Sequence, residues 1–382
     1  MAERRPATQV SPASPAGTAG RPISLRLDDL GATVYPECVP EGLADELPIL
    51  YSSLFSTLDW FLAYDRKRPT GACVLDEPRH VILFHRDGHI LEVLNKSFAC
   101  APEDARRICR ALFQVMPDVY LIHFSVMFPP QDLGLPWRLL ERFDHMVIDL
   151  PDSVDEYYAS LGKRTRKNVR WYQNRLERAH PDVHVEVVKP GERSRELLDQ
   201  LIAWKTQRFR RTGRVTYWET NATLADRVAD LIRRCGEVRM TLVEDEPAAL
   251  DVCFRTGDTA YIYEGAHDPR YDEFSLGFLT FYWYVCSALE SGARRVNALE
   301  GTQDSKTPLG AQPVRTTRVS VLRSEVARLR SLDEALRVWR RQRISDLQRL
   351  RHRLGQQARR YRAGAALAGF ITRRRARRRS AT

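Results

Sequence analysis

Apolar and polar positions in the first half of the chain follow the pattern of a mixed α/β unit. Residues 47–64 are mostly apolar and predict a helix that is buried on more than one side. Residues 80–93 contain two apolar runs around Asp87 and Gly88, which predicts a β-hairpin. Residues 104–113 predict a helix with Asp104 as its N-cap, and residues 119–128 predict a buried strand. We therefore expect a first lobe over residues 23–145, without a recognisable chemical motif.

From residue 146 onwards the pattern predicts a second lobe around a mostly antiparallel sheet. A strand at residues 146–150 precedes a helix that begins at Ser153, with Glu156 in capping-box spacing, and runs to Glu177. The remaining elements are a strand at 184–188, helices at 196–211 and 224–234, a three-strand meander at 239–244, 248–255 and 259–264, an apolar helix at 276–289, and strands at 295–299 and 317–322. We expect mixed α/β architecture, with helices flanking a central sheet over residues 146–322.

The two ends of the chain differ in composition from its body. Residues 1–22 are rich in Pro, Ala, Ser and Gly and lack the apolar core of a secretory signal, so they predict a disordered leader. Residues 323–382 hold 19 arginines, no lysine and four acids, a net charge of +15, whereas the whole chain carries +11. Apolar residues recur there at helical spacing, which predicts a basic amphipathic helical tail: Leu336, Trp339, Leu347 and Leu350.

This basic tail has three interpretations. It could lie on an anionic membrane surface, bind nucleic acid through phosphates, or pack on the body of the protein; we favour the membrane over nucleic acid. The seven cysteines are scattered and form no Cys-x-x-Cys pair, which argues for a reducing cytoplasm and against a metal site. No apolar run approaches the ~20 residues of a membrane-spanning helix. We therefore expect a cytoplasmic protein, with any membrane contact peripheral and at the inner face.

Three segments of the second lobe combine residues of chemical interest. The first is the basic run SLGKRTRKNVR at residues 160–170. The second is YIYEGAHDPRY at residues 261–271, followed by FSLG at 274–277 before the apolar helix. The third is Glu300-Gly301 with Lys306. Over residues 146–310, their order and spacing resemble the GNAT acyltransferase domain of CelD/BioF-like proteins and, more distantly, the FemAB peptidoglycan aminoacyltransferases. This resemblance implies tandem GNAT-like lobes, of which the first is degenerate.

The resemblance implies that the turn into the apolar helix holds the pyrophosphate of coenzyme A. Physically, a helix start offers backbone N–H groups without intrahelical partners and the positive end of the helix dipole. The alternative is an ordinary helix cap at Ser275. We expect an acetyl-CoA or acyl-CoA site formed by Tyr271, Phe274, Ser275, Leu276, Gly277, Phe278, Leu279 and Lys306.

Three side chains are candidates for the general base. Glu264 and Glu300 follow neighbouring strands, which by the resemblance splay apart to admit the thioester. A carboxylate there can take a proton from an ammonium if burial raises its pKa toward neutrality. His267 is the third candidate, because its unperturbed pKa is already ~6.5. Each could instead be a turn residue or a core hydrogen bonder, and the sequence does not choose among them.

Five basic residues of the first segment form a candidate clamp for an anionic donor: Lys163, Arg164, Arg166, Lys167 and Arg170. The donor would be coenzyme A, through its phosphates, or an acidic acyl-carrier protein. The alternative is a solvated helix face.

The sequence therefore predicts an N-acyltransferase that moves an acetyl or longer acyl group from coenzyme A, or from a carrier-protein thioester, to an amine. The acceptor would be a small molecule, a sugar or a peptide. The three segments contain no cysteine, which favours direct attack by the amine over a covalent enzyme intermediate. Two alternatives stay open: an aminoacyl-tRNA-dependent transferase of the FemAB type, and a non-catalytic GNAT-shaped scaffold that binds membrane or nucleic acid.

Overall fold

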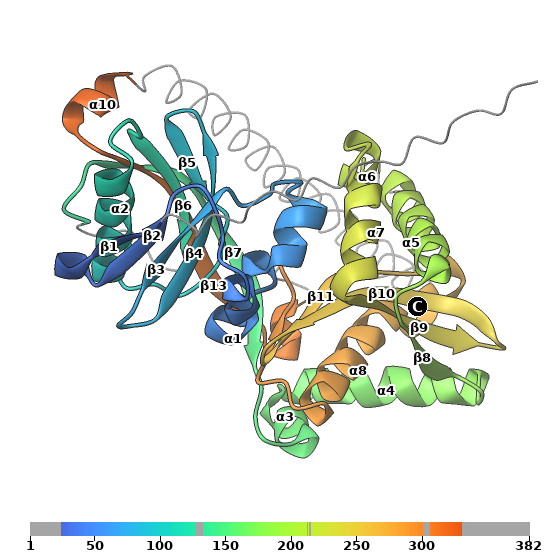
Figure 1. Cartoon of the computed structure of the whole chain (residues 1–382). Coiled ribbons are helices and arrows are strands. Elements are labelled where there is room, and N and C mark those ends of the chain that lie inside the picture. The colour runs from blue at the N-terminus through green and yellow to red at the C-terminus, as the bar shows by residue number, and fades with distance from the viewer. Residues whose placement is uncertain (1–23, 127–132, 212, 214, 301–305, 331–382) are drawn as a thin grey trace, which may run out of the picture.

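The fold is built on one 13-stranded sheet with the order β1-β2-β3-β4-β5-β6-β13-β7-β12-β11-β10-β9-β8. The computed structural model describes residues 24–126, 133–211, 213, 215–300 and 306–330. Neighbouring strands in this order are antiparallel except β5–β6 and β11–β12. Helices flank the sheet in both halves (Figure 1). These features confirm the predicted mixed α/β class with a mostly antiparallel sheet.

The first half of the sheet contains the predicted hairpin, second helix and buried strand in the predicted order, but it also contains three strands that were not predicted, at residues 25–27, 32–35 and 71–75. Two further predictions in this half are wrong. Its elements are β1 (Leu25–Leu27), β2 (Ala32–Tyr35), α1 (Leu47–Tyr51), β3 (Gly71–Leu75), β4 (His80–Asp87), β5 (Ile90–Val93), α2 (Pro102–Val115) and β6 (Leu121–Val126). The predicted helix at 47–64 is wrong, because Ser52 adopts a left-handed φ of 45° that ends α1, and only short turns follow at Leu54–Ser56 and Trp60–Tyr64. Asp104 is not the N-cap of α2; it is a buried residue of the first turn.

The second half follows the predicted order, but its first and last strands begin earlier than predicted, at Trp137 and Gln312, and a short helix at residues 217–220 was not predicted. Its elements are β7 (Trp137–Asp149), α3 (Val154–Ser160), α4 (Lys163–Ala179), β8 (His184–Val188), α5 (Glu192–Arg211), α6 (Tyr217–Thr220), α7 (Leu224–Cys235), β9 (Gly236–Val243), β10 (Glu246–Thr256), β11 (Thr259–His267), η5 (Pro269–Phe274), α8 (Leu276–Glu290), β12 (Arg295–Asn297) and β13 (Gln312–Leu322). One predicted helix is in fact two, α3 and α4. The chain is extended at Leu161 and Gly162, which places the Leu161 side chain in the core.

The two halves repeat one topology. In each half, two parallel strands are joined by a helix, β5 to β6 through α2 and β11 to β12 through α8. The second strand of each pair then lies antiparallel to a long strand, β6 to β13 and β12 to β7. Because β7 and β13 also pair with each other, the two halves share the centre of the sheet. The expected division at residues 145/146 falls inside β7.

A segment of the first half covers one face of the second. Leu47, Leu54 and Phe61 belong to the same core cluster as Leu201 of α5 and Val228 of α7. The hydroxyl of Tyr261 on β11 donates to the Ser52 carbonyl at 3.0 Å, and the Leu54 N–H donates to that hydroxyl at 3.1 Å. In the second half, α5 and α7 lie on one face of the sheet, and α8 and α4 lie on the other (Figure 1).

Only the first residues of the basic tail fall in the described part of the chain. Arg323 donates to the carbonyl oxygens of Phe113, Met116 and Val119, and α10 (Glu325–Arg330) follows. The tail's predicted apolar stripe from Leu336 to Leu350, and the predicted leader, lie outside the described residues. Among the described helices, none has the length and apolar character needed to cross a membrane.

Candidate active site

A gap opens between β11 and β12. The two strands pair only from Thr259↔Arg295 to Tyr261↔Asn297, but β11 continues to His267. Beyond Tyr261, the β12 side of β11 therefore has no strand partner within the described residues. The family resemblance implied that these two strands splay apart in this way. The strand predicted at residues 295–299 is shorter than expected, because β12 ends at Asn297.

A β-bulge in β11 decides which side chains face which helix. Ile262 pairs with Cys253, but Glu264 pairs with Val252, so Tyr263 is an extra residue. Strand side chains alternate between faces, and an extra residue reverses the alternation. Tyr263 packs in the same cluster as α5, as alternation from Tyr261 requires, and the extra residue then places Glu264 against α5 as well. Gly265 and His267 follow on the opposite face, beside α8.

Glu264 is a buried carboxylate with two unlike oxygens. The residue is 7% exposed, and it lies inside β11 rather than at a strand end. Its Oε1 accepts hydrogen bonds from the Lys205 ammonium of α5 and from the Gly265 N–H at 3.3 Å. Its Oε2 is buried and has no hydrogen-bond partner in the described part of the chain. Burial raises the pKa of Glu264 and lowers the pKa of Lys205, because each charge loses hydration. The Gly265 N–H and the charge of Lys306 oppose the shift of the Glu264 pKa.

Lys306 supports the chain beyond β12. Its Nζ donates to the carbonyl oxygens of Ala298, Leu299 (3.4 Å) and Glu300 (2.8 Å). Burial lowers the pKa of Lys306 to about 8, and Glu264 and Glu300 oppose this shift. The predicted cofactor lysine is thus engaged with main-chain oxygens near Glu264. The side chain of Glu300, the second candidate base, lies at an exposed position.

The start of α8 leaves backbone N–H groups open. Ser275 precedes the helix with a left-handed φ of 50°, and its side chain makes no capping hydrogen bond, so it is not an ordinary cap. The N–H groups of Leu276 and Gly277 have no acceptor inside the helix. Gly277 is exposed, and a Cβ there would lie 3.1 Å from Nδ1 of His267. His267, whose Nε2 is 2.9 Å from Oδ1 of Asp272, therefore lies beside the open N–H groups of Leu276 and Gly277, which form the α8 cradle. It is on the opposite face of the sheet from Glu264.

Most other predicted cofactor residues are core side chains. Tyr271, Phe274, Leu276 and Leu279 are buried and pack against one another. Phe278 is half-buried. Because the side chains of these four residues are buried, only their main-chain atoms could contact a phosphate of the cofactor.

The basic run on α4 divides into structural and exposed residues. Arg166 donates to the Ala159 carbonyl at 2.6 Å, and Arg170 donates to the Tyr158 hydroxyl at 3.4 Å, so both tie α4 to α3. Lys163, Arg164 and Lys167 are exposed and form no ion pair with the described residues. The candidate clamp therefore consists of these three.

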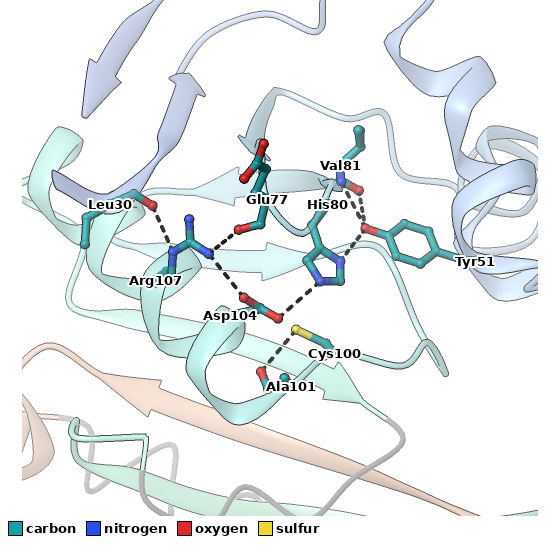
Figure 2. A network of polar contacts seen from close by, with 9 residues as sticks. All are labelled: Leu30, Tyr51, Glu77, His80, Val81, Cys100, Ala101, Asp104 and Arg107. Atoms are coloured by element: carbon teal, nitrogen blue, oxygen red, sulfur yellow. Dashed lines mark hydrogen bonds and ion pairs between the residues drawn. The ribbon is translucent and has the colours of Figure 1, made fainter. Parts of the chain in front are cut away.

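The start of α2, which corresponds by topology to the start of α8, does not suit an anion. Figure 2 shows the polar contacts of Asp104 and Arg107 there. Pro102 occupies the first turn and has no N–H, and the Asp104 carboxylate is buried there. Asp104 is held by Arg107 at 3.3 Å and faces His80 at 3.6 Å. Burial raises the pKa of the neighbouring Cys100 to about 12, so its thiol stays protonated. Of the two corresponding helix starts, only that of α8 is open.

Sequence reasoning missed three residues of the site. Lys205 lies four residues after the buried Leu201 on α5, so a charged residue on an apolar stripe was the available signal. Gly265 is exposed, and a Cβ there would lie 2.3 Å from Oδ1 of the buried Asp251. Burial raises the pKa of Asp251 to about 7. No local pattern indicates the contact between Gly265 and Asp251.

Comparison with known proteins agrees with this geometry. Residues 163–307 match the model of the acetyltransferase (GNAT) domain. A conserved protein of unknown function from Bacteroides thetaiotaomicron has a similar structure, with a TM-score of 0.52 and 13% identity over 75% of this chain and 98% of that one. FemX is similar at a TM-score of 0.51 and 12% identity, over 73% of this chain and 96% of its own. No curated protein sequence matches the chain. The chain therefore contains a GNAT acetyltransferase domain, and the two structures share its fold.

Proposed function

We propose that the protein is an N-acyltransferase that transfers an acyl group from coenzyme A to an amine at the gap between β11 and β12. The observation that carries this proposal is the position of Glu264. A bulge turns this buried carboxylate toward α5 at the unpaired stretch of β11, with Oε2 left without a described partner. A buried carboxylate of raised pKa is suited to accept a proton from an ammonium.

The proposed reaction needs one base and no covalent enzyme intermediate. Glu264 accepts a proton from the acceptor ammonium, and the resulting amine attacks the thioester carbonyl. The C–N bond forms, the C–S bond breaks, and the sulfur leaves as a thiol after taking up a proton. An ammonium and a thioester thus become an amide, a thiol and one proton released to solvent.

The start of α8 is the proposed site for the pyrophosphate of the donor. The open N–H groups of Leu276 and Gly277 suit a phosphate, and Gly277 has no side chain to obstruct it. Lys163, Arg164 and Lys167 add positive charge on the neighbouring helix α4. We assign the first half to a degenerate GNAT-like lobe, because it repeats the topology with a closed helix start, and its segment 43–64 forms one side of the acceptor region.

A transfer assay with the full-length chain tests this function. Thermal shift against acetyl-CoA, longer acyl-CoAs, free CoA and aminoacyl-tRNA identifies the donor, and thiol release with a panel of primary amines measures turnover. We expect Glu264→Gln, which keeps the shape but cannot accept the proton, to lose ~10²–10⁴-fold in rate with unchanged acyl-CoA affinity. Glu186→Gln, an exposed change on β8, is the matched control.

Two results would overturn the assignment. Stabilisation by aminoacyl-tRNA alone would favour the FemAB-type alternative. Absence of both donor binding and turnover in the wild type would favour the non-catalytic scaffold.

A further inference from the structure

We propose that Lys205 is a positioning residue for the transfer reaction: its ammonium holds Oε1 of Glu264 and thereby directs Oε2 at the amine of the acceptor. This inference rests on the proposed function and adds a residue that the family motifs do not contain. Lys205 comes from α5 and Glu264 from β11, 59 residues apart in sequence.

The two carboxylate oxygens of Glu264 have different surroundings and therefore different roles. Oε1 accepts from two donors, the Lys205 ammonium and the Gly265 N–H. Oε2 has neither a described partner nor solvent contact. With one oxygen held at two points, the plane of the carboxylate is fixed, and a proton can be accepted only at the other oxygen.

Lys205 is itself placed by packing. Its side chain is 16% exposed, and its Nζ lies 5.6 Å from the centre of the Tyr217 ring. Glu264 is its single ion-pair partner among the described residues. A buried ion pair is a poor device for stability, because desolvation offsets its attraction. Stability alone therefore does not account for a lysine at this point of α5.

The arrangement predicts a dependence on pH. Besides Lys205, Lys306 acts on Glu264, Arg208 of α5 acts on Lys205, and His145 of β7 and Glu300 act on Lys306. Asp251 lies on the other face of the sheet, behind Gly265. An ammonium in contact with a carboxylate favours its ionised form. Removing that charge should raise the pKa of Glu264 further, so the base would stay protonated up to a higher pH.

The experiment compares Lys205→Met and Lys205→Arg with the wild type in the full-length chain. The readout is the pH profile of thiol release from acetyl-CoA, with the primary alkylamine from the panel that the wild type acylates best. We expect Lys205→Met to lose at least ~10-fold in kcat and to move the acid limb to higher pH, by about one unit for each tenfold change in proton affinity. Lys205→Arg keeps the positive charge, so the acid limb of its pH profile should lie at the wild-type position. Lys189→Met, at an exposed position after β8, is the control.

A second measurement does not need the acceptor. The carboxyl of Glu264 is titrated by carbon-13 NMR of glutamate-labelled protein, with Glu264→Gln to assign the signal. If the wild type acylates amines but Lys205→Met moves neither the limb nor this titration, the positioning role is overturned. If Lys205→Met moves the titration while the wild type acylates no amine, the contact with Lys205 still determines the pKa of Glu264, and the proposed transferase function is overturned instead.

Discussion

At the scale of single residues, Tyr263 has the largest effect on the candidate site. Alternation along a regular strand would place Glu264 on the same face as Ile262, against α8. Because Tyr263 is an extra residue, Glu264 instead meets Lys205 on the α5 face, and His267 is carried to the face of the α8 cradle. The three predicted bases therefore separate: Glu264 lies at the gap, His267 beside the cradle, and Glu300 at an exposed position.

Burial of His145 on β7 should make the fold sensitive to acid. Burial and Lys306 lower its pKa to about 4, below the ~6.5 of an unfolded histidine. The unfolded chain binds the proton first on acidification, so stability is complete above pH ~6.5 and is lost as the pH falls toward 4. The loss at pH ~5 should be ~2 kcal/mol. Urea unfolding at about pH 7 and about pH 5 measures this loss as a difference between variants, because the buried Asp251, whose pKa is raised, contributes with the opposite sign in every variant. His145→Gln should lack the ~2 kcal/mol loss, whereas the exposed His184→Gln should retain it.

At the scale of elements, two helix starts that correspond by topology have opposite chemistry. The α8 start has open N–H groups and an exposed glycine, and the α2 start has a proline and a buried aspartate. The difference lies in local composition, yet its meaning depends on the parallel strand pairs that place each helix. This contrast motivates two tests of the donor site.

Two substitutions at Gly277 separate the effect of its N–H from the effect of an added side chain. Gly277→Ala adds a Cβ 3.1 Å from His267 and keeps the N–H, whereas Gly277→Pro also removes the N–H and restrains Leu276. Loss of one hydrogen bond to a charged group should weaken acyl-CoA binding ~10–100-fold in the proline variant, and clearly less in the alanine variant. Calorimetric titration of CoA measures both, with circular dichroism to verify folding. A folded proline variant with wild-type affinity would show that the phosphate site lies elsewhere.

Charge reversal on α4 tests the remaining clamp. Lys163 and Lys167 are one turn apart on an exposed face, so Lys163→Glu with Lys167→Glu should weaken binding of the anionic donor up to ~10-fold at low salt. The effect should shrink at high salt, because exposed charges are screened. Arg178→Glu at the other end of α4 is the control. A loss of affinity seen only with acyl-carrier protein would identify a protein-bound donor. If the variant binds the donor as tightly as the control does, this face of α4 is an ordinary solvated helix face and not a clamp.

At the scale of the whole molecule, the two lobes are joined through one sheet. β13 belongs to the second half by sequence, but its Val319 and Val321 lie in the core of the first half. In the reverse direction, residues 43–64 complete the core around α5 and α7. Each lobe therefore supplies part of the other's interior.

This sharing predicts that neither lobe folds alone. Fragments 23–145 and 146–322 cut β7 and separate β13 from β6. Expressed singly, each should lack a cooperative thermal transition, because a shared core is left open; coexpressed, they should associate. Calorimetry against the intact chain measures this. Cooperative unfolding of either isolated fragment would show that the lobes are independent domains.

The sequence by itself determined the local elements and the motifs. The β4–β5 hairpin, the β9–β11 meander and α8 were predicted correctly, because apolar periodicity and turn residues are local signals. The resemblance of residues 146–310 to a GNAT domain is confirmed by the family match over residues 163–307. Only the tertiary structure decided the break after α1, the bulge at Tyr263 and the pairing of Lys205 with Glu264. These features depend on contacts between distant segments, which fix strand register and desolvate charges, and no local period of the sequence records them.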